Sequence, residues 1–109
     1  MEKRFMSISF PTPKNFPYNT VFYFDDEIAL MMGNYKENEK KSLGMRWIEA
    51  ESPLGYPNAF GRGMWMVVSD NLALYILEGI NKNLNSEKDS IKDMDEFEKA
   101  LDYFCHLQS

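Results

Sequence analysis

Hydrophobic and polar residues alternate in several short segments of the chain, with the period of two that predicts β-strands. Between residues 5 and 10, apolar side chains alternate with two serines, and residues 20–24 are all β-branched or aromatic. Residues 43–48 alternate again, whereas residues 64–68 are apolar on both faces. That last pattern is expected of a central strand covered on both sides.

A period of about 3.6 residues takes over later in the chain and predicts two helices. The first helix follows Ser69 or Asp70, either of which can accept a hydrogen bond from a first-turn N–H. Its core-facing positions are Ala73, Ile76, Leu77, Ile80 and Leu84. Gly79 weakens this helix, so we expect the helix to end nearby or to pack closely there.

The second helix follows residues 81–90, a polar segment that reads as a linker. Asp93 and Glu96 have the spacing of a capping box at its start, with Asp in place of Ser or Thr. Its apolar face comprises Met94, Phe97, Ala100, Leu101, Phe104 and Cys105. The periodicity therefore indicates a helix that packs on the core through one side and carries charge on the other.

Residues 25–33 admit two interpretations. Three acids, an apolar run and then Gly33 suit a short helix with a favourable dipole and a glycine just past its end. The same residues also suit a tight turn followed by a return strand. The helix is slightly favoured, and the polar residues 34–42 after it are expected to form an exposed loop.

Together these elements predict a single α+β domain over residues 1–109. We expect a small, mostly antiparallel sheet of about four strands with two C-terminal helices packed on one face; the strand order is left open. No apolar run approaches the ~20 residues of a membrane-spanning helix, and the N-terminus has no apolar signal-peptide core. A cytoplasmic location is therefore expected. The single cysteine, Cys105, agrees with a reducing compartment and is expected to be a small buried hydrophobic residue.

The formal net charge of −5 argues against nucleic acid and against an anionic membrane surface as partners. Most of the excess is near the C-terminus, where residues 86–109 contain seven acids and three lysines. A solvated helix face is the usual explanation of such a cluster. The sharper interpretation is a docking surface for a basic protein through Asp95, Glu98 and Asp102, because opposed potentials steer association.

The sequence contains no convincing catalytic or metal-binding constellation. His106 is the only histidine and directly follows Cys105, and neighbours on a helix point about 100° apart, so they do not form a nucleophile–base pair. One cysteine and one histidine fall short of a zinc site. The acids at 25–27 could supply a general acid and base, but a solvated turn is the favoured interpretation. We therefore expect no enzyme activity, no metal and no cofactor.

Residues 51–63 form a long glycine- and proline-containing connection, which is near the upper limit for a compact domain. It presents Tyr56, Phe60 and Arg62, residue types that are enriched at protein interfaces. A self-packed Ω-loop is slightly favoured over a recognition loop. Trp47 and Trp65 flank it and either pack in the core or line a ligand groove, and Arg46 should point to the face opposite Trp47.

The leading functional hypothesis is a non-enzymatic protein-binding domain. Its most concrete form is an immunity- or antitoxin-like inhibitor that occludes a basic toxin, such as a nuclease. The expected contact residues are Tyr56, Phe60, Arg62, Asp95, Glu98 and Asp102. The alternative is a small-molecule binding domain whose aromatic pocket lies under the 51–63 loop and includes Trp47 and Trp65. Either a monomer or a homodimer is compatible with the pattern.

Overall fold

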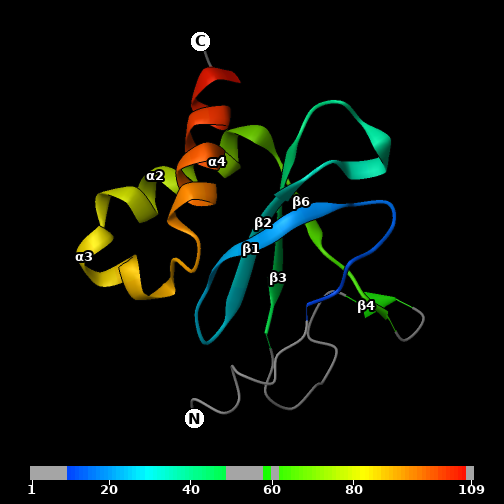
Figure 1. The fold of residues 1–109 in the computed structure, drawn as a ribbon, viewed down its shortest axis with the longest axis horizontal. Coiled ribbons are helices and arrows are strands. Elements are labelled where there is room, and N and C mark those ends of the chain that lie inside the picture. The colour runs from blue at the N-terminus through cyan, green and yellow to red at the C-terminus, as the bar shows by residue number, and fades with distance from the viewer. Residues whose placement is uncertain (1–9, 49–57, 60–61, 108–109) are drawn as a thin grey trace.

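The computed structural model describes residues 10–48, 58–59 and 62–107, so the strand predicted over residues 5–10 lies almost entirely outside them. The main sheet has the order β1-β2-β3-β6 with every neighbouring pair antiparallel, and β4 pairs with β5 separately. Figure 1 shows the helices gathered beside this sheet. The strands are β1 (Tyr18–Phe24), β2 (Ile28–Gly33), β3 (Ser42–Trp47), β4 (Asn58–Ala59), β5 (Arg62–Gly63) and β6 (Met66–Val68), and the helices are η1 (Tyr35–Glu37), α2 (Asp70–Lys82), α3 (Leu84–Glu87), η2 (Lys88–Ser90) and α4 (Met94–Leu107). The predicted α+β class, with an antiparallel sheet and C-terminal helices on one face, is confirmed.

The helices enclose the main core against one face of the sheet. Side chains of α2 and α4 pack in one core with alternate residues of β2 (Leu30 and Met32) and β3 (Leu43 and Met45), as the pleat of a β-strand requires. The largest fully buried members of this core are Phe22, Leu30, Leu43, Leu77, Phe97 and Phe104. The apolar positions predicted at the centre of each helix are thus buried in α2 and α4.

The opposite face of the sheet is covered by the proline-containing segment before β1. Phe16 from that segment is buried against Ala29, Met31 and Trp65. The indole N–H of Trp65 and the hydroxyl of Tyr18 both donate to the carbonyl oxygen of Pro11, each over 2.9 Å. A segment that the sequence marks only by its strand-breaking prolines therefore forms the second layer of the core.

Arg46 is buried on this second face, opposite Trp47 as expected. Its guanidinium lies over the Trp65 ring, 5.7 Å from the centroid, and donates a hydrogen bond to the carbonyl oxygen of Met64. Burial lowers the pKa of Arg46, because the charged form loses hydration. The contact fixes the segment that leads into β6 against β3.

Residues 28–33 form a strand, so the favoured helix interpretation of this segment is wrong. The carboxylate of Asp25 accepts hydrogen bonds from the N–H groups of Glu27 (2.7 Å) and Ile28 (2.9 Å), which closes a tight turn. The strand then pairs with β1 on one side and β3 on the other. This pairing on both sides satisfies more backbone groups than one short helix would.

The strand predicted to be central, residues 64–68, is also corrected. Only its last part, β6, belongs to the sheet, and it lies at the edge beside β3. Met66 and Val67 are 39% and 41% exposed, whereas Trp65 and Val68 are buried. The apolar run here belongs to an edge strand. The prediction failed because the composition of a segment does not determine how many strands pair with it.

The helical half of the chain agrees with the sequence prediction at the start of α2 and differs from it further along. Ser69 caps α2, since its hydroxyl accepts from the N–H of Leu72 over 3.4 Å. Residues 81–90 are largely helical (the end of α2, then α3 and η2), so the predicted linker is wrong. Of the two alternatives at Gly79, the first holds: α2 ends nearby, at Lys82. A Cβ added at Gly79 would meet no atom within 4 Å, so the helix does not pack closely there.

Cys105 is exposed, contrary to the expectation that it is buried on the apolar face of α4. The adjacent Phe104 is fully buried. Because consecutive helical residues point about 100° apart, Cys105 lies on the flank of the helix.

Tyr23 ties β1 to the helical layer. Its hydroxyl donates to the Glu87 carboxylate over 2.7 Å and lies 3.4 Å from the Asp25 carboxylate. Burial, together with the hydrogen bond to Glu87, raises the pKa of Tyr23 well above its ordinary value. The neutral hydroxyl is therefore the form that the native structure stabilises.

Two glycine substitutions should have opposite effects on stability. Gly79→Ala should raise the free energy of unfolding by about 1 kcal/mol, since the site is open and alanine loses less backbone entropy in a helix. Gly33→Ala should lower it by about 1–3 kcal/mol, because the new Cβ would overlap the backbone carbonyl of Pro17. Urea unfolding of both variants measures the difference, and a destabilised Gly79→Ala would contradict the open environment.

Tyr23→Phe should lower the free energy of unfolding at neutral pH by about 1 kcal/mol through loss of the bond to Glu87. It should also flatten the alkaline pH dependence. The raised pKa of native Tyr23 means that the unfolded chain ionises first, so this stabilisation is complete below pH ~10 and is lost as the pH rises further. Urea titrations at neutral and alkaline pH test this. The pKa of Tyr18 is raised as well, so a smaller alkaline fall should remain, and equal pH slopes in both proteins would contradict the role of Tyr23.

Candidate functional site

The predicted recognition loop is described only in part. Tyr56 and Phe60 lie outside the described residues, and Arg62 stands in β5, where its backbone pairs with Ala59. Figure 1 places β4 at one side of the molecule and α4 at the other. The described part of the 51–63 segment therefore lies away from α4, and the role of the loop stays a prediction.

The two tryptophans do not share a face of the sheet. Trp65 is 5% exposed and its indole packs on the second face, with its N–H bonded to Pro11. Trp47 is 43% exposed and stands at the end of β3, on the side to which Leu43 and Met45 point. The two indoles therefore do not converge on one face of the sheet.

The acidic residues predicted on the last helix lie together on the outer side of α4. Asp95, Glu98 and Asp102 are all exposed, and their spacing of three and four residues keeps them within about 60° around the helix. We call these three residues the acidic face. His106 lies one turn beyond, with its Nδ1 3.3 Å from an oxygen of the Asp102 carboxylate.

Lysines border this side of the molecule. Lys40 lies 3.6 Å from the carboxylate of Asp70 at the start of α2. The backbone N–H of Lys41 donates to the hydroxyl of Tyr103 over 2.9 Å, which holds the segment before β3 against α4. Lys99 is exposed on α4 itself. The acidic face is therefore flanked by cationic side chains.

A hollow of about 320 Å³ lies beside the acidic face, between α4 and the strands. It adjoins a second hollow of about 230 Å³ that shares four of its lining residues. Together with Glu96, the larger hollow is lined by Asn19, Met32, Lys41, Lys99, Asp102 and Tyr103. We call this larger space the Glu96 hollow, because Glu96 is the one buried acidic residue in the described part of the chain, at 8% exposure.

Sequence reasoning assigned Glu96 to a capping box, and the structure forms only half of that motif. The Asp93 carboxylate accepts from the N–H of Glu96 over 3.0 Å, as predicted. The reciprocal bond does not form, because the N–H of Asp93 donates to the carbonyl oxygen of Phe22 instead. The sequence carries no signal that would have identified Glu96 as a site residue. The competition for the N–H of Asp93 arises only in the folded chain.

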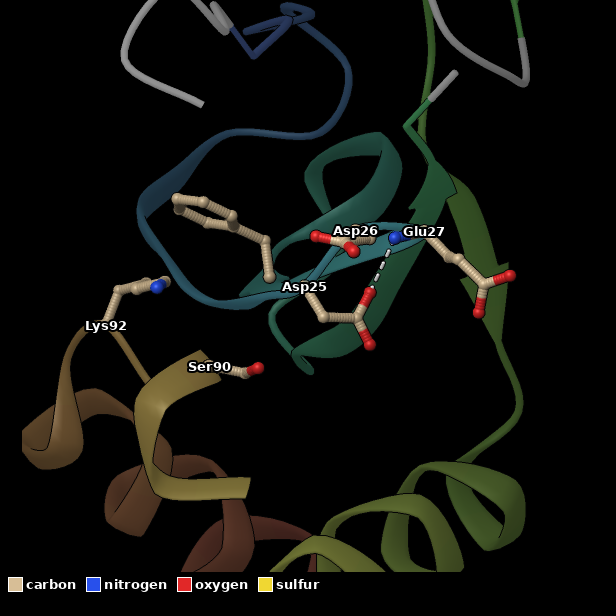
Figure 2. Close-up of a pocket in the computed structure, with 6 residues that line it drawn as sticks. Asp25, Asp26, Glu27, Ser90 and Lys92 are labelled. Carbon is tan, nitrogen blue, oxygen red and sulfur yellow. Dashed lines mark hydrogen bonds between the residues drawn. The ribbon is translucent and has the colours of Figure 1, made fainter. Parts of the chain in front are cut away.

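Another hollow, of about 590 Å³, opens at the turn between β1 and β2 (Figure 2). Its wall includes the three acids of residues 25–27 together with Ser90 and Lys92. Asp25 is engaged by the turn, as the dashed bond in Figure 2 shows, and Lys92 donates to the carbonyl of Asp89 and lies over the Phe24 ring. This geometry is that of an open, solvated turn.

Within the described ranges, no group of three or more His, Cys, Asp and Glu side chains is placed to hold a metal ion. In the same part of the chain, no helix has the length and apolar character needed to cross a membrane. No family model matches the sequence, and neither the curated proteins nor the solved structures contain a significant match to it.

Proposed function

We propose that the chain is a non-enzymatic protein-binding domain that engages a basic protein through the acidic face of α4. The observation that supports this most is the placement of three exposed carboxylates on one side of a helix whose other side is fixed in the core. Phe97 and Phe104 anchor that buried side. The carboxylates therefore stand on a rigid scaffold at a defined spacing.

The physical contribution of such a face is expected in association kinetics. Exposed ion pairs add little to affinity individually, because water and salt screen them. A field of one sign nevertheless attracts an oppositely charged partner over distances near the Debye length and raises the association rate. The concentration of acids in residues 86–109 gives the molecule this asymmetry.

The most concrete form of the proposal is an immunity- or antitoxin-like inhibitor that covers a basic toxin. Such an inhibitor would meet its target in the cytoplasm, the expected location of the chain. Because β4 and α4 lie at opposite sides of the molecule, one flat partner surface would not cover both elements. The proposal assigns the main contact to α4 and keeps Tyr56, Phe60 and Arg62 as a second surface.

The alternative of a small-molecule pocket under the 51–63 loop has less support. The two tryptophans of that pocket point to opposite faces of the sheet, and the indole N–H of Trp65 already donates to the carbonyl oxygen of Pro11. A ligand would therefore have to bind one tryptophan without the other. The acidic face is preferred for this reason.

Replacing Asp95, Glu98 and Asp102 together by lysine should slow association with the basic partner by about tenfold or more at low salt. It should also flatten the dependence of the association rate on ionic strength, since the attractive field is lost. The partner is first isolated by affinity capture with the wild-type protein from the source cells. Association rates of both proteins are then measured by biolayer interferometry at low and high salt.

A matched triple variant separates the local face from the total charge. Glu27, Glu39 and Asp89 are exposed acids outside α4, and replacing them by lysine changes the net charge by the same amount. This control should retain most of the wild-type association rate. Equal slowing in the two triple variants would show that net charge alone matters, and no slowing in either would remove α4 as the docking surface.

A further inference from the structure

We infer that the Glu96 hollow receives an arginine side chain of the basic partner, with the Glu96 carboxylate as the counter-ion of its guanidinium group. This inference rests on the proposed function and specifies the chemistry of one contact within it. The acidic face would attract the partner, and the hollow beside it would hold one side chain. The two roles involve different residues and are separately testable.

The carboxylate of Glu96 is buried without a partner of its own. Among the described residues, none forms a hydrogen bond or ion pair with it, and the N–H that a capping box would offer is taken by Phe22. Removing an ionised carboxylate from water is costly unless opposite charge or hydrogen-bond donors replace the lost hydration. An incoming cation would supply both.

The lining of the hollow favours a cation over an anion. Glu96 is the buried charge, and Asp102 adds a second carboxylate at the same hollow. Lys41 and Lys99 also line it, but both residues are exposed, so their charges are better hydrated than that of Glu96. A bound ion gains most electrostatic free energy from the least hydrated charge in the hollow, because that charge is least screened by water. Here that charge is the carboxylate of Glu96.

Arginine suits this space better than lysine. Its guanidinium is weakly hydrated and planar, and its five N–H donors allow it to bond a carboxylate and further oxygens at once. The hollow offers Asn19 and Asp102 as further acceptors next to Glu96. Arginine is also among the residue types that dominate binding energy at the desolvated centres of interfaces.

The test uses N-acetyl-L-arginine amide as the probe and N-acetyl-L-citrulline amide as its uncharged analogue. Backbone amide shifts of the ¹⁵N-labelled protein are followed by NMR during titration. The arginine probe should produce saturable shifts that centre on Asn19, Lys41 and Tyr103, and the citrulline probe should not. Saturable binding of the citrulline probe with equal affinity, or no saturable shift with arginine, would overturn the inference.

Glu96→Gln should weaken binding of the arginine probe by about tenfold, since one charge-assisted contact is lost. Glu27→Gln is the matched control, because it removes the same charge from an exposed position outside α4, and it should bind within a few-fold of wild type. Thermal melting confirms that both variants fold. Should Glu96→Gln fail to fold, the comparison of the two probes on the wild-type protein still decides the question.

The outcomes also separate this inference from the proposed function. The arginine titration needs no partner, whereas the lysine substitutions on the acidic face are read out only with one. A failed titration alongside slowed association removes the Glu96 hollow and keeps the acidic face. A successful titration alongside unaffected association keeps the arginine site and removes the acidic face as the steering surface.

Discussion

The sheet of this protein is apolar on both faces, and the rest of the structure depends on covering both. The helices bury one face through Phe97, Phe104 and Leu77, and the segment before β1 buries the other through Phe16. The carbonyl oxygen of Pro11 is central to the second cover, because two side chains, Trp65 and Tyr18, donate to it. A proline-containing segment with few backbone donors of its own is thereby held by one side chain from β1 and one from the residue before β6.

This two-layer arrangement determines which side chains remain for recognition. Because α4 is anchored along one side, its opposite side has a fixed orientation, and the residues on its flank lie next to the strands. Glu96 occupies that flank. In the connection between η2 and α4, just before Glu96, the N–H groups of Lys92 and Asp93 both donate to the carbonyl oxygen of Phe22. The same connection that fixes the helix therefore leaves the Glu96 carboxylate without its capping partner.

The sequence predicted the elements whose periodicity is long, and it failed where several structures fit one short pattern. Both helical stripes and the strand at β3 were predicted from spacing, since each repeats over several turns or pleats. The run at 28–33 is too short to distinguish a helix from a strand, and pairing with two neighbours decided it. The edge position of β6 depends on strand order, which no local pattern encodes. Of the candidate site, the exposure of Asp95, Glu98 and Asp102 was predictable from helical phase. The missing capping bond of Glu96 was not, because the N–H of Asp93 bonds instead to Phe22, far away in the chain.

The two edges of the sheet differ in how much backbone they leave open for pairing with another strand. Tyr23 at the β1 edge forms an isolated bridge with Ile91, so part of that backbone is already occupied. At the other edge, β6 is only three residues long. A strand that short presents too few backbone groups to template another chain, even though Met66 and Val67 are exposed and apolar. Because β6 is so short, an apolar strand can lie at the edge of the sheet and still offer few backbone hydrogen-bonding groups for fibril formation.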